Sequence, residues 1–213
     1  MKEQEYRRIE EYMKACMTDA AHDREHVYRV LRAALKIADT EPEADRDILT
    51  AACLLHDIGR EKQYADPKVC HAEAGAEMAR RFLSELGWDE ARVSHVSACI
   101  FTHRFRKGRE PASIEAKILF DADKLDVCGA IGIARTLQYQ GRVGEPLYWV
   151  DAKGDPLPGD PGEPASFLKE YRKKLSKLYD RFYTPAAAEM AKGRREIAEA
   201  FYQAVLQEIH LTD

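Results

Sequence analysis

The sequence predicts an all-α fold, and two patterns lead to that prediction. Along most of the chain, apolar residues recur every three or four positions, as on one face of a helix, whereas period-two alternation occurs only in fragments such as 147–150. Glycine and proline are concentrated in one stretch, because residues 141–164 hold five of the nine prolines and five of the twelve glycines. We therefore expect a helical bundle with one long Gly/Pro-rich insertion, completed by C-terminal helices.

The helices expected in the first half of the chain begin and end at residues with known terminal preferences. Gly59 and Gly87 are placed to end helices, the former in a left-handed cap, and Asp89 is placed to cap the start of the next one. In chain order the expected elements are helices over 24–39, from Pro42 or Glu43 past Leu55, over 71–86 and over 89–103, and then a basic loop over 104–110.

The second half is expected to hold four more helices. Ser113 opens the first of them, and Gly129 and Gly132 lie three residues apart within the second. Because glycine in a helix costs about 1 kcal/mol relative to alanine, we expect this pair to allow close packing of another helix. Without a preceding strand the pair does not form a phosphate-binding loop. The expected ranges are 113–125, 127–139, 165–182 and 185–211.

The length and composition fit one globular domain of ordinary size. The chain has 213 residues, of which 45% are apolar and 33% are charged, and the helices after the Gly/Pro-rich stretch are too short to form a second core. We expect a single domain over 1–213, made of a core over 21–136, a flap-like loop over 141–164 and C-terminal helices over 165–211.

The same composition excludes several classes of protein. No run of about eighteen apolar residues is present, and the charged N-terminus lacks the apolar core of a signal peptide, so no membrane span or secretion is expected. Five widely spaced cysteines without a CxxC pair indicate reduced, buried thiols in the cytoplasm. A net charge of −4 argues against a nucleic-acid coat, but local basic patches would still bind a small phosphorylated molecule.

A histidine and an aspartate lie at the end of a helix that is expected to be buried. His56 and Asp57 follow the apolar run AACLL and precede Gly59. Neighbouring helical residues point about 100° apart, so both side chains reach one centre only at the end of the helix. Burying the two groups without partners is costly. Either a divalent cation or a hydrogen-bonded His–Asp pair in the core would satisfy them.

Two more polar residues stand among apolar ones on other expected helices. His26 lies on the apolar face of the first expected helix, and Asp123 follows an apolar run in a later one. Together with the pair His56 and Asp57 they form a ligand set of nitrogen and oxygen atoms. Because the set contains no cysteine, it favours Mn²⁺, Fe²⁺, Co²⁺, Ni²⁺ or Mg²⁺, with positions open for water and substrate, over a closed structural zinc site.

The order His, His-Asp, Asp resembles the HD-domain superfamily of metal-dependent phosphohydrolases. The strings that carry the resemblance are HVYRV around His26, LLHDIGRE around His56 and Asp57, and DADKLD with the following GAIGIAR around Asp123. The last string is similar to a bacterial subfamily of small HD hydrolases, and the resemblance covers 21–136. It implies an all-helical core and metal-dependent hydrolysis of phosphate esters or anhydrides, very often in nucleotides.

Two assignments within this pattern have rivals. His22 rivals His26, which is favoured because the Arg-Val pair that usually follows the family's first histidine comes three residues after it. Asp121 and Asp126 rival Asp123, which is favoured because its tetrad Ala-Asp-Lys-Leu resembles the family's segment. The two rival aspartates would then lie behind the metal ligands or face the substrate.

Further residues are expected to act in catalysis. Asp57 would orient or deprotonate the attacking water, and Lys124 would offset charge on the phosphate. Related proteins have histidines near the places of His71 and His103, and we expect these two to contact phosphate or donate a proton; the alternative is that they are surface or core histidines. Two-metal members of the family often show a His-His pair, whereas Arg104 follows His103 here, so a tightly held second metal is not expected.

Basic side chains are expected to hold the phosphate oxygens, because arginine can donate two parallel hydrogen bonds to a phosphate. Arg135, like Lys124, is favoured because it follows the metal aspartate closely, and Arg29 and Asp126 are expected to contact the substrate as well. The full set of basic candidates is Arg29, Arg60, Arg104, Arg106, Lys124 and Arg135.

The resemblance predicts an enzyme that hydrolyses a small phosphorylated substrate, most often a nucleotide, as a pyrophosphohydrolase, a nucleotidase or a phosphodiesterase. The alternative is a sensor module that binds a metal and a nucleotide without turnover. The loop over 141–164 is expected to act as a flap near the metal pocket, because Tyr148 and Trp149 give it apolar contacts that a linker does not need. The C-terminal helices would pack on the core or on a second subunit, and a homodimer is favoured.

Overall fold

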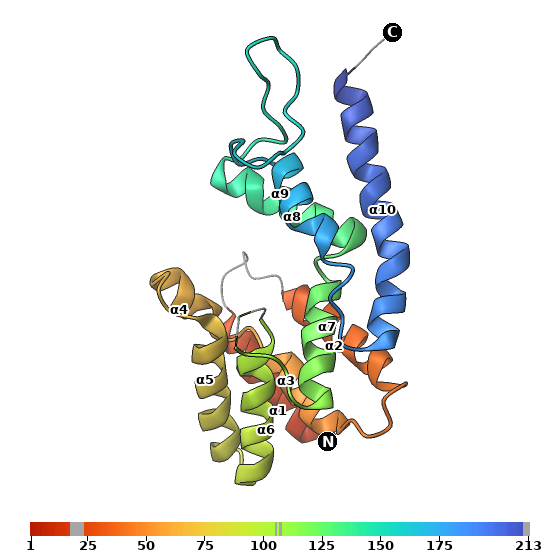
Figure 1. Ribbon diagram of the computed structural model, residues 1–213. Helices are drawn as coiled ribbons and strands as arrows, with labels where there is room; N and C mark the ends of the chain where they lie inside the picture. Colours follow the sequence, from red (N-terminus) through yellow and green to blue (C-terminus); the bar gives the residue numbers. More distant parts are fainter. Residues whose placement is uncertain (18–23, 105, 107, 211–213) are drawn as a thin grey trace. The chain divides into compact units, whose positions relative to one another are not determined.

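The structure is a computed structural model that describes residues 1–17, 24–104, 106 and 108–210. It confirms the all-α fold, since these residues form helices joined by turns and loops, and their β-type pairing is limited to an isolated bridge between Val150 and Pro156 (Figure 1). Within these ranges no helix is long and apolar enough to cross a membrane. His22, the rival of His26, lies outside the described residues.

Most of the expected helices are present with nearly the expected boundaries. In chain order the elements are α1 Glu3–Cys16, α2 Arg24–Ala38, α3 Arg46–Leu55, α4 Arg60–Ala65, α5 His71–Glu85, α6 Glu90–Thr102, α7 Ile114–Leu125, α8 Gly129–Val143, α9 Phe167–Lys173, a 3-10 turn Leu175–Lys177 and α10 Pro185–His210. Two helices lie outside the expected ranges, α1 at the start of the chain and the short α4, which lies between two turns and has no buried residue in its six positions.

The chain groups into two compact units, Met1–Asp123 and Lys124–Asp213. The first unit contains α1 to α6 and nearly all of α7, and the second contains α8, α9 and α10. The boundary falls inside the core expected over 21–136, and the single domain over 1–213 stays a prediction.

Helix α3 is the buried centre of the first unit. Its last five residues, Ala51–Leu55, have no exposed surface, and α1, α2 and α6 pack against it. Helices α5 and α6 lie side by side along their length (Figure 1). Because α3 is enclosed by its neighbours, any polar residue at its C-terminal end is held in a buried position.

The helix expected from Pro42 or Glu43 begins later, at Arg46. Asp45 caps it, because its carboxylate accepts hydrogen bonds from the first free backbone N–H groups, at 2.8 and 3.1 Å. The backbone N–H of Asp45 in turn donates to the buried carboxylate of Glu115 on α7, at 2.8 Å. A contact between distant segments therefore supports the capped start of α3.

Gly59 does not form the predicted left-handed cap. Its φ is −84°, an ordinary right-handed value, and it lies directly before α4. A Cβ atom at this position would lie 2.3 Å from the carbonyl oxygen of His71 and 2.6 Å from the backbone nitrogen of Gly75. The residue is glycine because the turn after α3 approaches the backbone of α5 closely, which brings the start of α5 to the end of α3.

In the second unit, a glycine allows α8 and α10 to approach each other. Helix α8 begins at Gly129, two residues later than expected, so Gly129 and Gly132 both lie in its first turn. Gly129 has a φ of +67°, and a Cβ there would lie 2.9 Å from the Cβ of Arg194 on α10, as predicted for close packing of another helix. At Gly132 the close neighbour is instead the carbonyl oxygen of Val127, at 2.2 Å.

The helix expected over 165–182 is shorter, because the backbone leaves the helical conformation at Lys174, with φ −128° and ψ −59°. The loop before it is attached to its own unit by two hydrogen bonds. The indole N–H of Trp149 donates to the carbonyl of Ala165 at 2.9 Å, and the hydroxyl of Tyr202 donates to the carbonyl of Pro158 at 3.0 Å. These contacts distinguish the loop from a bare linker, and its role as a flap stays a prediction.

Candidate metal centre

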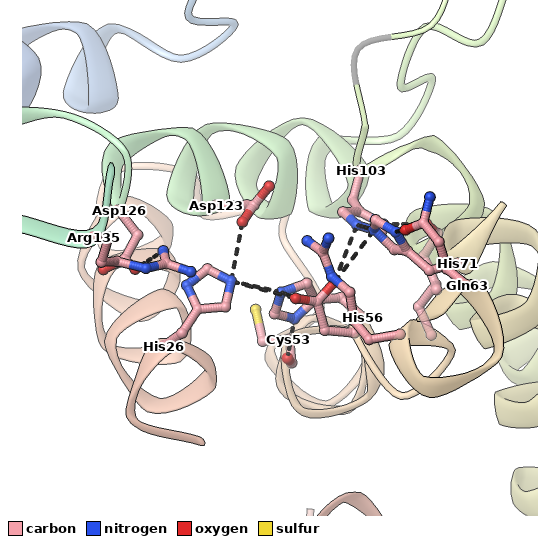
Figure 2. A network of polar contacts seen from close by, with 12 residues as sticks. His26, Cys53, His56, Gln63, His71, His103, Asp123, Asp126 and Arg135 are labelled. Atoms are coloured by element: carbon pink, nitrogen blue, oxygen red, sulfur yellow. Dashed lines mark hydrogen bonds and ion pairs between the residues drawn. The ribbon is translucent and has the colours of Figure 1, made fainter. Parts of the chain in front are cut away.

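The four side chains expected to bind a metal converge in the first unit, and Figure 2 labels three of them, His26, His56 and Asp123. His26 comes from α2, His56 and Asp57 from the end of α3, and Asp123 from α7. The Nε2 atom of His26 lies 3.2 Å from Nε2 of His56 and 3.2 Å from Oδ1 of Asp123. Oδ2 of Asp57 lies 3.6 Å from the first of these nitrogens and 3.7 Å from the second. The end of the buried helix is therefore the meeting point that the sequence predicts.

A second group of donors meets the other oxygen of Asp57. His71 is the first residue of α5, and His103 directly follows α6. Their Nε2 atoms lie 3.3 Å apart, and Oδ1 of Asp57 lies 3.4 Å from His71 and 3.7 Å from His103. Each group has its ligand atoms within 4.8 Å of one another, and Asp57 has one oxygen toward each.

The second histidine pair forms although Arg104, and not a histidine, follows His103. The expectation about a second metal stays a prediction. In the structure the imidazole that faces His103 is that of His71, which lies 32 positions away in the chain and is the first residue of α5. The contact of Gly59 with the His71 carbonyl places α5 there.

Hydrogen bonds to the far side of three imidazole rings fix which nitrogen faces the centre. Nδ1 of His56 lies 2.7 Å from the carbonyl oxygen of Cys53, and Nδ1 of His103 lies 2.5 Å from that of Ile100. A carbonyl oxygen only accepts, so each Nδ1 carries the proton. Nδ1 of His71 donates in the same way to the side-chain oxygen of Gln63, at 2.6 Å. In a neutral imidazole, Nε2 then presents a lone pair to the centre.

This arrangement fits divalent metal ions. Two facing nitrogens with lone pairs 3.2 or 3.3 Å apart repel each other unless a proton or cation lies near both. Oδ1 of Asp57 is buried and accepts no hydrogen bond of ordinary geometry from any described residue, although Nε of Arg60 lies 3.0 Å from it. Converging imidazole nitrogens and carboxylate oxygens that lack donors are the ligands that Mn²⁺, Fe²⁺, Co²⁺ or Ni²⁺ take.

The carboxylates of the centre are held in the ionised form. Burial by itself would raise the pKa of Asp57, but the charge of Arg60 and the surrounding imidazoles outweigh it and hold the pKa well below its usual range. Burial likewise opposes ionisation of Asp123, and the hydrogen bond and charge of His26 lower its pKa instead. Both groups are therefore anionic ligands at neutral pH.

The second histidine pair is held in the neutral form. Burial and then the charge of Arg60 lower the pKa of His71 to about 2. Burial and then His56 lower the pKa of His103 to about 4. A neutral imidazole whose Nδ1–H is already engaged by a carbonyl donates no proton to a substrate, so we favour a ligand role over the expected proton-donor role.

Two residues that contact the metal ligands are not among the residues favoured from the sequence. Arg60 follows Asp57 by three positions and forms an ion pair with it at 3.0 Å, whereas Lys124 and Arg135 were favoured among the basic candidates. Gln63 orients His71 and is not among the residues expected from the sequence. The position of Arg60 and Gln63 in the sequence indicates a role at the centre, since both lie on α4, within one or two turns of the His-Asp pair.

The remaining expected residues lie as follows. Arg29 is half-buried on α2, one turn after His26. Asp126 is buried in the second unit, where it accepts a hydrogen bond from the guanidinium of Arg135. Lys124 is half-buried and directly follows Asp123 in α7. Their roles toward a substrate stay predictions.

Two other residues lie outside the two donor groups. His95 packs locally, because its Nε2 lies 2.9 Å from Glu115 and 3.0 Å from the hydroxyl of Ser113. Asp121 is fully buried, and of the two neighbouring aspartates it is Asp123 that joins the cluster with His26 and His56.

An all-helical unit that gathers imidazoles and carboxylates around one shared aspartate defines a metal-binding hydrolase of the HD type. The model of the HD domain family matches residues 24–128, a range that contains every donor of both groups. The chain therefore belongs to the HD superfamily of hydrolases, in agreement with the resemblance that its sequence shows.

Known proteins of this family resemble the chain over nearly its whole length. YpgQ of Bacillus subtilis is 30% identical over 204 residues, which cover 94% of this chain and 92% of that protein. Its crystal structure in complex with ADP has a TM-score of 0.75 at 26% identity, covering 98% of this chain and all of YpgQ. An HD-superfamily hydrolase from Bacillus thuringiensis has a TM-score of 0.75 at 31% identity and full coverage of both chains.

A partial match involves a larger enzyme. The 3'-5' exoribonuclease YhaM of Bacillus subtilis is 30% identical over 115 residues, which cover 47% of this chain and 37% of that protein. The similarity is confined to about half of this chain.

Proposed function

We propose that this protein is a metal-dependent phosphohydrolase that cleaves a phosphate ester or anhydride of a nucleotide. The observation that carries the proposal is the presence of two donor groups, each with ligand atoms within 4.8 Å of one another; Oδ1 of Asp57 belongs to one group, and its Oδ2 lies near two histidines of the other. The nucleotide part is supported by the crystal structure of YpgQ with ADP, a protein that this chain matches over nearly its full length.

We further propose that the centre takes two cations of unequal affinity. One group would be His26, His56 and Asp123 with Oδ2 of Asp57, and the other His71 and His103 with Oδ1 of Asp57. The first offers two carboxylates, whereas the second offers only the shared carboxylate, whose charge Arg60 already partly offsets. We therefore expect the second cation to bind more weakly, because fewer anionic ligands face it.

In the proposed reaction a water oxygen bonds to phosphorus, and the bond from phosphorus to the leaving oxygen breaks. The proton that the water loses passes to the leaving oxygen or to the solvent, and the protein residues have distinct tasks in this step. When bound, a divalent cation supplies Lewis acidity toward the phosphoryl oxygens and lowers the pKa of water. Asp57, ionised and 5% exposed, is placed to orient the water between the two groups. Its low pKa favours orientation of the water over removal of its proton.

Backbone carbonyl oxygens orient two imidazole rings of the centre. The carbonyl oxygens of Cys53 and Ile100 hold His56 and His103 with their lone pairs inward, and these rings are almost fully buried. Ligands that are already oriented do not have to be ordered when the substrate binds, so the binding energy remains available for the reaction.

The test combines metal content with product analysis. We expect the purified protein with Mn²⁺ to release phosphate or pyrophosphate from one or more nucleotides, and His56→Ala and Asp57→Ala to lose bound metal and activity together. His95→Gln is the matched control, because this histidine pairs with Glu115 outside the metal centre. Full metal content and full activity in both alanine variants would refute the assignment. Tight nucleotide binding with no product would support the sensor instead.

A further inference from the structure

Two arginines flank the same edge of the centre without sharing a counter-ion. Arg60 pairs with Oδ1 of Asp57 at 3.0 Å, on the side of that carboxylate that faces His71 and His103. Arg104 directly follows His103, and the side chain of Cys70, which precedes His71, lies near enough to raise the pKa of Arg104. Both guanidinium groups are close enough to His71 to contribute to the lowering of its pKa.

Arg104 is the under-coordinated member of the pair. Its Nη1 atom is buried and has no hydrogen-bond partner among the described residues. The same range of residues contains no carboxylate within ion-pair distance of it. The side chain as a whole is half-buried, and burial, then the charges of Arg106 and Arg60, lower the pKa of Arg104.

Such an arrangement is unfavourable unless an anion occupies it. A buried donor without an acceptor costs free energy, and two like charges held near each other add to the cost. The thiol of Cys70 is a weak acceptor and leaves Nη1 unsatisfied. A water molecule would satisfy the nitrogen but would not offset the repulsion between the two guanidinium groups, whereas a phosphate oxygen would do both.

We propose that Arg104, together with Arg60, forms a phosphate-binding subsite beside the His71–His103 pair, and that Arg104 sets the affinity for the substrate's phosphate. This inference rests on the proposed function, since the bound phosphate would belong to the substrate. It also gives a reason why arginine, rather than a second consecutive histidine, follows His103: His71 already supplies the second imidazole, and Arg104 binds the anion.

The test measures binding of inorganic phosphate to the full-length, Mn²⁺-loaded protein by titration calorimetry. A charge-assisted hydrogen bond is worth about a ten- to hundredfold change in affinity, so we expect Arg104→Gln to weaken phosphate binding by about that factor. Arg104→Lys should recover part of it, because lysine keeps the charge but not the fork of donors. Arg81→Gln removes the same charge from an exposed site on α5 and should bind like the wild type.

Hydrolysis gives a second readout that separates binding from structure. Arg104→Gln should raise KM about ten- to hundredfold for the best substrate, with kcat, metal content and melting temperature close to those of the wild type. Wild-type phosphate affinity in a folded, metal-loaded Arg104→Gln protein would overturn the inference. Absence of any turnover in the wild type would instead overturn the proposed function, and the calorimetric result would still decide the role of Arg104.

A measurement on the unaltered protein covers the case in which the variant does not fold. Phenylglyoxal modifies accessible guanidinium groups, and the modified residues are identified by peptide mass spectrometry. We expect inorganic phosphate to slow the modification of Arg104 severalfold and to leave that of Arg81 unchanged. Equal rates at Arg104 with and without phosphate would contradict the subsite.

Discussion

At the scale of single residues, the centre depends on which nitrogen of each imidazole faces inward. For three of the rings a carbonyl or amide oxygen on the far side decides it, and for His71 that oxygen belongs to the side chain of Gln63. A substitution at Gln63 removes this contact and leaves every proposed metal ligand in place, whereas a substitution cannot remove a backbone carbonyl.

Gln63→Ala should lower the affinity of the second cation by about ten- to a hundredfold, because the ring of His71 loses the partner that orients it. Gln63→Glu should keep the affinity or raise it, since a carboxylate accepts the same hydrogen bond. Competition of Mn²⁺ against a fluorescent chelator measures both. Gln203→Ala, in an exposed position of α10, serves as the control. Unchanged Mn²⁺ affinity in Gln63→Ala would contradict the orienting role.

Acidification should destabilise the metal-free protein between about pH 6.5 and pH 4. The pKa of His71 falls from 6.5 in the unfolded chain to about 2 in the fold, and that of His103 falls to about 4. Below pH 6.5 the unfolded chain therefore binds protons at these histidines that the folded state does not bind, so the free energy of unfolding decreases as the pH falls. Each histidine contributes about 1.4 kcal/mol per pH unit within this window.

Urea unfolding of the metal-free protein at pH 7 and pH 5 measures this effect. The pKa values of Asp57 and Asp123 are lowered from 3.8, so their stabilising contribution is lost only below that pH and does not enter the window. The double variant His71→Gln, His103→Gln should show a clearly flatter dependence, and His95→Gln should follow the wild type. A wild-type stability that is equal at both pH values would show that the two rings titrate normally.

At the scale of secondary structure, the site exists because the ends of three helices meet. The end of α3, the start of α5 and the end of α6 supply His56, His71 and His103, and Gly59 is the point of closest approach between the first two. The position of α5 is thus coupled to the geometry of the second donor group.

Gly59→Ala should therefore damage both stability and metal binding. The new Cβ would lie 2.3 Å from the carbonyl oxygen of His71, and relief of that overlap would move the start of α5 at a cost of about 1–3 kcal/mol. We expect a lower urea midpoint and a weaker second cation. Gly193→Ala in α10 is the control, because its Cβ meets nothing within 4 Å and should be neutral or stabilising. Wild-type stability and metal affinity in Gly59→Ala would contradict the close contact.

At the scale of the whole molecule, the metal and the long loop are the two features that link fold to function. Metal binding favours the folded state, so Mn²⁺ at about one hundred times its dissociation constant should add about 2.7 kcal/mol to the free energy of unfolding. For a chain of this size the melting temperature should rise by about 5–10 °C, as seen by calorimetry. The Asp57→Ala variant should lose most of this rise, and an equal rise in that variant would place the metal elsewhere.

The segment over 141–164, whose first three residues extend α8 so that the loop itself begins at Gly144, tests the expectation of a flap. Trp149 is 45% exposed although its indole N–H is bound to Ala165, so its ring is free to contact a ligand. Trp149→Ala should raise KM by about three- to tenfold with little change in kcat, since an aromatic contact is worth about that much. Tyr139→Ala, which removes a more exposed aromatic of the same unit, is the control. If removal of the loop leaves both substrate range and KM unchanged, the flap is wrong.

The helical class and the main helix boundaries follow from apolar periodicity, which is a property of local sequence. Isolated polar residues on apolar faces indicate His26, His56, Asp57 and Asp123, and the family resemblance favours His26 and Asp123 over their rivals. The expectations from the sequence are wrong at Gly59 and at the start of α3, where contacts with distant segments decide the local backbone.

The pairing of His71 with His103 and the unsatisfied nitrogen of Arg104 become visible once the helices are packed. These features depend on the distance between residues far apart in the chain, whereas the ion pair of Arg60 with Asp57 depends on the turn that follows α3. Sequence spacing describes one helix at a time, whereas the packing of α3, α5 and α6 sets which of their ends meet.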